Sequence, residues 1–232
     1  MCQLSGAIIQ LNQNLPCWLA EIGFSDFAGS TLVHSTGGAA ALAGIMLLGA
    51  RSGRFDSKGQ PKALQPFAAS SIPLVTIGVF ILWLGWFGFN GGSQLALGTF
   101  DDAVAISTIF INTNLAACGG VLAAGVITRL MYGKTDVIQM LNGAIGGLVA
   151  ITAEPLAPSP FAAILIGAVG GLIVVFGTKL LFNFKLDDVV GAIPAHLFAG
   201  IWGTLAVPLS ILIFIPTLGI LFGTQPEVTE AP

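Results

Sequence analysis

The chain has 232 residues, of which 55% are hydrophobic and only 8% are charged, and its formal net charge is −3. A soluble domain carries roughly a quarter charged residues, so this composition excludes an ordinary soluble protein. The few basic residues fall in short segments between apolar runs, which excludes nucleic acid as a partner. The apolar runs can cross about 30 Å of hydrocarbon as helices and are too long for barrel strands. We therefore expect an all-α, polytopic transmembrane helical bundle.

The apolar runs predict six membrane spans. In chain order, their expected ranges are 27–50, 69–96, 103–130, 137–154, 160–182 and 189–215. Residues 23–215 then form one membrane domain, preceded by the segment 1–22 and followed by the tail 216–232. The opening stretch "MCQLSGAIIQLNQNLP" has neither a basic region nor a clear cleavage site, so we do not expect a signal peptide.

The basic residues predict how these spans are oriented. All eight lie at the ends of the first, third and fifth spans or in the connections that follow them: Arg51, Arg54, Lys58, Lys62, Arg129, Lys134, Lys179 and Lys185. The alternate connections contain none. Under the positive-inside rule the basic connections face the cytoplasm, here of a plasma or inner cell membrane. The segments 1–22 and 216–232 are then both expected outside.

One pattern, D-x-x-G-x-x-x-x-H-x-x-x-G, occurs twice, as "DFAGSTLVHSTGG" from Asp26 and as "DVVGAIPAHLFAG" from Asp188. The only two histidines of the chain, His34 and His196, hold the same place in both copies. Eight residues separate each histidine from its aspartate, which is roughly 12 Å along a helix. Because the two spans enter from opposite sides, both histidines are expected near the mid-plane. This is a partial inverted repeat of the kind found in transporters.

The histidines have two alternative interpretations. They could be packing residues that hydrogen-bond across the bundle. They could also face a pathway, because a titratable side chain at mid-membrane is costly and usually has a function. Desolvation favours neutral imidazole, which has one donor and one acceptor nitrogen. Two such rings could share a proton and leave other nitrogens facing a lumen.

Aspartates and aromatic residues complete the candidate site. Asp26 and Asp188 are expected to cap helix N-termini, and Asp26 could also lend negative potential to a cation-binding vestibule. In "LWLGWFGFNGGSQ", Trp86, Phe89 and Ser93 recur at three- and four-residue spacing and so share a helix face. The stretch suits an interfacial aromatic belt. It also suits a shallow site for a small hydrogen-bonding cation, because aromatic faces attract cations.

Other chemistries are not indicated. Nothing in the sequence resembles a phosphate loop, an activated nucleophile or a carboxylate pair for hydrolysis, and its cysteines form no C-x-x-C pair, so we expect neither an enzyme nor a cofactor. A carrier for a transition metal using His and Asp is disfavoured. The aspartates lie roughly 12 Å along the helix from their histidines, whereas metal ligands converge to about 2 Å. We expect no metal site.

Four motifs, in order, resemble the ammonium transporters of the Amt/Mep/Rh family: "DFAGSTLVHSTGG", "GWFGFNGGS", "NGAIGGLVAITA" and "DDVVGAIPAHLFAGIWGTLAV". The resemblance runs from about residue 18 to 209. It implies the fifth to tenth spans of an eleven-helix fold. It also implies a role for each matched residue: His34 and His196 as pore histidines, Trp86 as a pore-flanking tryptophan, Phe89 as an outer gate, Ser93 as the recruitment hydroxyl and Asp26 as a structural aspartate.

The function implied by this resemblance is transport. Ammonium is concentrated at the outer aromatic mouth and loses its proton, and ammonia then passes a narrow hydrophobic lumen along the histidines. The implied partners are ammonium or ammonia, the lipid bilayer and two further copies of the chain in a homotrimer. A P-II regulatory protein is a candidate partner, although no motif here matches the eleventh span and tail that help to receive it in relatives.

The sequence also departs from the family pattern. It has no match to the first four spans, which supply another gate phenylalanine and the tryptophan of the recruitment site. A common aspartate five residues before the second histidine is Gly191 here, while Asp188 keeps the more distal acidic position. Two hypotheses follow. The chain is a transporter or part of one, or it is a truncated, transport-incompetent membrane protein with a structural or ammonium-sensing role.

Overall fold

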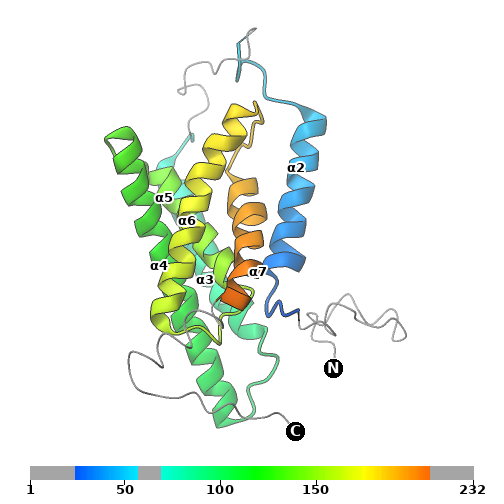
Figure 1. Ribbon diagram of the computed structural model, residues 1–232, viewed down its shortest axis with the longest axis vertical. Coiled ribbons are helices and arrows are strands. Elements are labelled where there is room, and N and C mark those ends of the chain that lie inside the picture. Colours follow the sequence, from blue (N-terminus) through cyan, green and yellow to red (C-terminus); the bar gives the residue numbers. More distant parts are fainter. Residues whose placement is uncertain (1–23, 57–68, 210–232) are drawn as a thin grey trace, which may run out of the picture.

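The computed structural model describes residues 24–56 and 69–209, which form helices joined by turns and short loops (Figure 1). The predicted outer segments 1–22 and 216–232 lie outside the described residues, as do Lys58, Lys62 and the end of the sixth predicted span.

Each predicted span coincides with one helical segment, which confirms the all-helical fold class. In chain order these are η1 (Ser30–Ser35) continuing into α2 (Thr36–Leu48), α3 (Ile72–Gly92), α4 (Phe100–Tyr132), α5 (Val137–Ile151), α6 (Pro160–Asn183), and η3 (Ile193–Phe198) continuing into α7 (Ala199–Leu209). Four of them, Ser30–Leu48, α3, α4 and α6, are long and apolar enough to cross a membrane. The other two, α5 and Ile193–Leu209, are shorter apolar helices.

Local capping explains where several helices begin. At α4 the Thr99 side chain accepts from the Asp102 amide at 3.1 Å, and the Asp102 carboxylate accepts in return from the Thr99 amide at 3.0 Å. At α5 the Asp136 carboxylate accepts from the amides of Ile138 and Gln139. These side chains satisfy backbone N–H groups that have no partner within the first turn of a helix. The polar breaks between apolar runs therefore set the helix boundaries.

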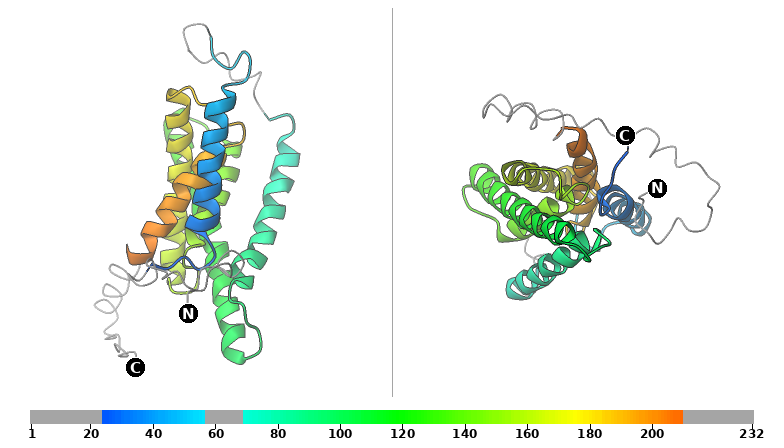
Figure 2. Two further views of the ribbon diagram at one scale, coloured as in Figure 1. Left: turned by 90° about the vertical axis from the view of Figure 1, so that its right-hand side faces the viewer. Right: turned by 90° about the horizontal axis from the view of Figure 1, so that it is seen from below.

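Helices α4, α5 and α6 form the tightly packed centre of the bundle. Their contacts run through small residues. A Cβ on Gly120 would meet the carbonyl of Gly143, and one on Gly167 would meet the backbone of Ala116. In a membrane, where apolar lipid gives helices no hydrophobic reason to associate, such close backbone approach is the main source of packing energy. By contrast, α3 lies at the edge of the bundle, with one end away from the other helices (Figure 2).

The two helices that carry the repeated pattern lie side by side and run in opposite directions. The chain enters η1 and α2 at one end of the bundle, and η3 and α7 return from the other end (Figures 1 and 2). η1 contacts α7, and α2 contacts η3. This antiparallel pair is the partial inverted repeat predicted from the sequence.

Candidate functional site

The two histidines meet where the antiparallel helices cross. His34 lies in η1 and His196 in η3. Their Nδ1 atoms are 3.2 Å apart, within hydrogen-bond distance. The ring centroids are 5.3 Å apart and the ring planes differ by 28°. Two residues 162 positions apart in sequence therefore form one unit.

The last glycine of each copy of the pattern allows this approach. A Cβ on Gly38 would collide with the backbone of Leu197, the residue after His196. A Cβ on Gly200 would collide with the Ser35 hydroxyl, next to His34. Each helix thus places a glycine against the residue that follows the other helix's histidine. The four-residue spacing between histidine and glycine in the repeated pattern therefore fits the point where the two helices cross.

The first glycine and the aspartate of each copy shape the start of the helix. Gly29 and Gly191 have positive φ angles of 114° and 79°, which side-chain-bearing residues rarely adopt. Just after this turn, the Asp188 carboxylate accepts from the amides of Gly191, Ala192 and Ile193 at 2.8–3.0 Å. These are the contacts of a helix cap.

The equivalent carboxylate, Asp26, makes the same kind of contact at the opposite end of the bundle. It accepts from the amides of Thr31 and Leu32 at 3.0 and 2.9 Å. The side chain is buried, and this burial raises the pKa of Asp26 above its ordinary value even though the amide bonds lower it. Both of these hydrogen bonds join Asp26 to the backbone of the turn that carries His34.

Both histidines lie in π-helical turns, which the residue pattern does not predict. η1 and η3 are each six residues long and pass directly into the α-helices α2 and α7. A π-turn widens the helix by one residue per turn, and such turns are frequent at functional sites. In η1 the Ser35 hydroxyl donates to the carbonyl of Ser30, five residues earlier, at 3.0 Å. No residue type in either segment signals a π-turn, and both turns lie where the two helices contact each other.

Aromatic rings of α3 complete the cluster around His34. The His34 ring stacks on Trp86 with a centroid separation of 4.9 Å and an angle of 17°, and Phe89 lies 5.5 Å away in a tilted contact. Ser93, one turn beyond Phe89, donates its hydroxyl hydrogen to the Phe89 carbonyl at 2.8 Å. The structure therefore brings together His34, His196, Trp86 and Phe89, and Ser93 is the C-terminal cap residue of the helix that carries Trp86 and Phe89.

One histidine nitrogen has no hydrogen-bond partner within the part of the chain that the structure describes. His34 Nε2 is buried, and among the described residues nothing accepts from it or donates to it. A hydrogen bond between the two Nδ1 atoms requires opposite tautomers. The ring that donates has a bare Nε2, and the ring that accepts carries its hydrogen on Nε2. The pair can thus offer one acceptor and one donor nitrogen to a small polar molecule.

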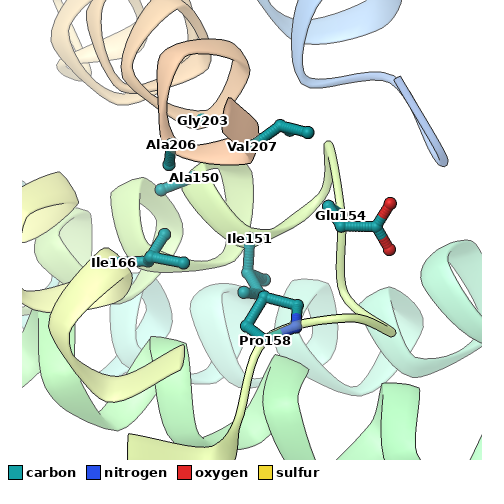
Figure 3. A pocket seen from close by; sticks show the side chains of 8 residues that line it. All are labelled: Ala150, Ile151, Glu154, Pro158, Ile166, Gly203, Ala206 and Val207. Carbon is teal, nitrogen blue, oxygen red and sulfur yellow. The ribbon is translucent and has the colours of Figure 1, made fainter. Parts of the chain in front are cut away.

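Two cavities lie away from this cluster. A crevice between α5, α6 and α7 is lined mainly by apolar side chains such as Ile151 and Ile166, while the Glu154 carboxylate points away from them (Figure 3). It leaves no room for a water molecule. A second cavity, of about 160 Å³, lies at the end of the bundle where η3 begins; its lining includes Arg54, Gln139, Asn142, Asp188 and Pro194. Within residues 24–56 and 69–209, no group of three His, Cys, Asp or Glu side chains could hold a metal ion.

Two interactions near the site were not predicted. Asp187, next to the capping Asp188, accepts from the Arg51 guanidinium at 2.7 and 2.8 Å and from the Arg51 amide at 3.0 Å. The Arg51 side chain thereby holds the pKa of Asp187 below its ordinary value. Thr152, at the end of α5, accepts from the Trp86 indole at 2.9 Å. The sequence shows that Asp187 lies next to a second aspartate and that a threonine lies near the end of the fourth apolar run, but it does not indicate that Arg51 and Trp86 are their partners.

An apolar helical bundle built around an antiparallel helix pair has the architecture of a polytopic membrane protein. The chain belongs to the ammonium transporter family. The model of the Ammonium Transporter Family matches residues 10–221.

Individual relatives agree with this assignment. The chain is 48% identical over 185 residues to ammonium transporter Amt2 of Archaeoglobus fulgidus, covering 80% of this chain and 38% of the relative. It is 38% identical to ammonium transporter 1 member 1 of Arabidopsis thaliana, over 80% of this chain and 38% of the relative. The chain therefore spans well under half the length of these relatives.

Solved structures share the fold. A structure named "Sensor Amt Protein" superposes with a TM-score of 0.79 at 34% identity, covering 86% of this chain and 47% of that one. Saccharomyces cerevisiae Mep2 superposes with a TM-score of 0.70 at 31% identity, covering 81% of this chain and 40% of that one.

Proposed function

We propose that this chain contributes the twin-histidine part of a pore that moves ammonium or ammonia across a cell membrane. The observation that carries the proposal is the 3.2 Å contact between the Nδ1 atoms of His34 and His196, made by helices that run in opposite directions. Membership of the ammonium transporter family supports the substrate.

The chemistry of the histidine pair suits ammonia better than ammonium. Carrying a bare cation through an apolar lumen is expensive. Ammonia is neutral and can both donate and accept hydrogen bonds. The acceptor and donor Nε2 atoms of the pair would replace part of its hydration, and the buried Nε2 of His34 has no competing protein partner among the described residues. The pair would therefore lower the cost of crossing the mid-plane.

The aromatic rings suit the preceding step. Phe89 presents a ring close to His34 and is 39% exposed, so it can contact both a cation outside and the histidine inside. The Ser93 hydroxyl lies one turn farther along α3 and can accept from ammonium. Cation–π and hydrogen-bond contacts would concentrate ammonium there. Proton loss would then follow before the substrate meets His34.

The remaining features of the proposal follow from charge and family. The end of the bundle with Arg51 and Arg54 faces the cytoplasm of a plasma or inner membrane, and both termini lie outside. The complete protein is a homotrimer in which every subunit has a pore. A P-II regulatory protein is a candidate partner at the cytoplasmic side.

The test is uptake of labelled methylammonium by cells that lack their own ammonium transporters. This chain is expressed alone and together with the first four spans of a full-length relative, in each case as wild type, His34→Ala and His196→Ala. Uptake that requires the wild-type chain and is altered by either substitution supports the proposal. Normal membrane expression without uptake in either arrangement overturns it and favours the structural or ammonium-sensing alternative.

A further inference from the structure

The end of α5 contains a buried hydrogen-bond network centred on Thr152. The Thr152 hydroxyl oxygen accepts from Trp86 Nε1 at 2.9 Å. It can donate its one hydrogen to the Leu148 carbonyl oxygen, 2.7 Å from Thr152 Oγ1, or to Asn90 Oδ1, 3.2 Å from it. The Asn90 amide then donates to the Thr113 hydroxyl at 3.0 Å. Thr152, Asn90 and Thr113 are all fully buried. The network links α3, α4 and α5.

The same end of α5 also holds the segment that leads into η1. The amide of Ala28 donates to the Thr152 carbonyl at 3.0 Å, and the amide of Phe27 donates to the Ala153 carbonyl at 2.7 Å. One turn earlier, the Ser30 hydroxyl donates to the Val149 carbonyl at 2.6 Å. The start of the helix that carries His34 is therefore fixed to α5 by three hydrogen bonds.

These two sets of contacts meet in one stack. The Thr152 side chain holds the Trp86 indole, its carbonyl holds the approach to His34, and the two rings stack 4.9 Å apart. We infer that Thr152 is a positioning residue, whose hydroxyl orients the Trp86 indole against His34 and so keeps His34 aligned with His196. The inferred effect on transport rests on the proposed function, whereas the effect on ring geometry does not.

The physical reason is the cost of a buried, unpaired indole N–H. Trp86 is buried, and without the hydroxyl its N–H would have to find another acceptor or stay unsatisfied. The first outcome moves the indole, and the second removes the bond that fixes its orientation on the His34 ring. Valine matches the shape of threonine but lacks the hydroxyl, whereas serine keeps the hydroxyl and lacks only a methyl group. The pair Thr152→Val and Thr152→Ser therefore separates hydrogen bonding from packing.

The experiment is nitrogen-15 NMR of the full chain in lipid nanodiscs, labelled at histidine. The chain has only two histidines, so every ring signal comes from this pair. Thr152→Val is expected to shift the ring signals, and Thr152→Ser is expected to restore those of the wild type. Unchanged ring signals in Thr152→Val overturn the inference, and so does a shift of equal size in Thr152→Ser.

A double-mutant cycle tests whether Thr152 acts through Trp86. In a Trp86→Phe background the indole N–H is absent, so Thr152→Val should shift the histidine signals little further. A full additional shift would overturn the inference. Should Thr152→Val not fold, Thr152→Cys replaces it, because a thiol is a much weaker acceptor.

Uptake provides the functional readout. Where the wild type takes up methylammonium, Thr152→Val should reduce uptake by about five- to tenfold at equal membrane expression, and Thr152→Ser should recover it. Unchanged uptake in Thr152→Val would overturn the inferred role in transport. The absence of wild-type uptake would count against the proposed function alone, because the NMR result decides the positioning role without transport.

Discussion

Gly38 of α2 lies directly against the backbone of Leu197, the residue that follows His196 in η3. Gly200 has the reciprocal position against Ser35, the residue that follows His34. Together they bring the two helix backbones close enough for the histidine Nδ1 atoms to lie 3.2 Å apart. The histidine contact therefore depends on two residues that have no side chain.

This crossing predicts that alanine substitution at Gly38 lowers stability much more than alanine substitution at the neighbouring Gly37. Gly38→Ala places a methyl group in the Leu197 backbone, and the resulting overpacking should cost about 1–3 kcal/mol and separate the histidines. The matched control is Gly37→Ala, because a Cβ at Gly37 meets nothing within 4 Å. Thermal unfolding in detergent compares the two variants. Equal stability of Gly38→Ala and Gly37→Ala would contradict the crossing geometry.

The sequence predicted the helical segments and the pairing of the histidines, because both depend on patterns that are visible along the chain itself. Apolar runs between polar breaks gave six helices, and the twofold occurrence of D-x-x-G-x-x-x-x-H-x-x-x-G indicated the inverted pair. The roles of the two glycines in each copy were not assigned, because the chain has 31 glycines and most could serve any close helix contact.

What the sequence did not predict depends on contacts between distant residues. The π-turns around His34 and His196 lie where the two helices contact each other. The bonds from Thr152 to Trp86 and from Arg51 to Asp187 join residues 66 and 136 positions apart. A threonine or a second aspartate in a loop has many possible partners, and only the packed structure selects one.

Asn112 is predicted to hold the connection between α5 and α6. Its buried amide donates to the carbonyls of Pro155 and Pro158 at 3.0 and 2.8 Å. Asn112→Ala leaves both carbonyls without this donor and should destabilise the protein by about 1–3 kcal/mol. Asn114→Ala is the control, because Asn114 lies on the same helix but is exposed. Denaturation monitored by circular dichroism should show a lower free energy of unfolding for Asn112→Ala and an unchanged one for Asn114→Ala.

Asp187 forms an ion pair with Arg51 and a second, at 3.4 Å, with Arg54, and these pairs predict a pH-dependent contribution to stability. Asp187→Asn should lower the free energy of unfolding by about 1–2 kcal/mol at pH 7. This is less than for a fully buried pair, because the Arg51 side chain is 40% exposed and screened by solvent.

The pH dependence follows from the direction of the Asp187 shift. Hydrogen bonds from Arg51 lower the pKa of Asp187 from its ordinary value of 3.8. The stabilisation is therefore fully present above pH 3.8 and is lost as pH falls through the pKa of the folded state. The melting-temperature difference between wild type and Asp187→Asn should be constant from pH 7 to about pH 5 and shrink below about pH 4. A difference that grows in acid would refute this assignment.

Ser93 is predicted to affect how well ammonium is captured rather than how fast it crosses, provided that the chain transports as proposed. Its hydroxyl lies beyond Phe89 on α3, so Ser93→Ala removes an acceptor for the cation but leaves the histidine pair and Trp86 in place. The concentration for half-maximal methylammonium uptake should rise by about five- to tenfold, the effect of one hydrogen bond to a charged group, with little change in maximal uptake. The control is Ser107→Ala, because the Ser107 hydroxyl donates to the carbonyl four residues earlier at the same 2.8 Å. If both variants raise the half-maximal concentration equally, the effect belongs to the local helix bond, and the recruitment role of Ser93 is wrong.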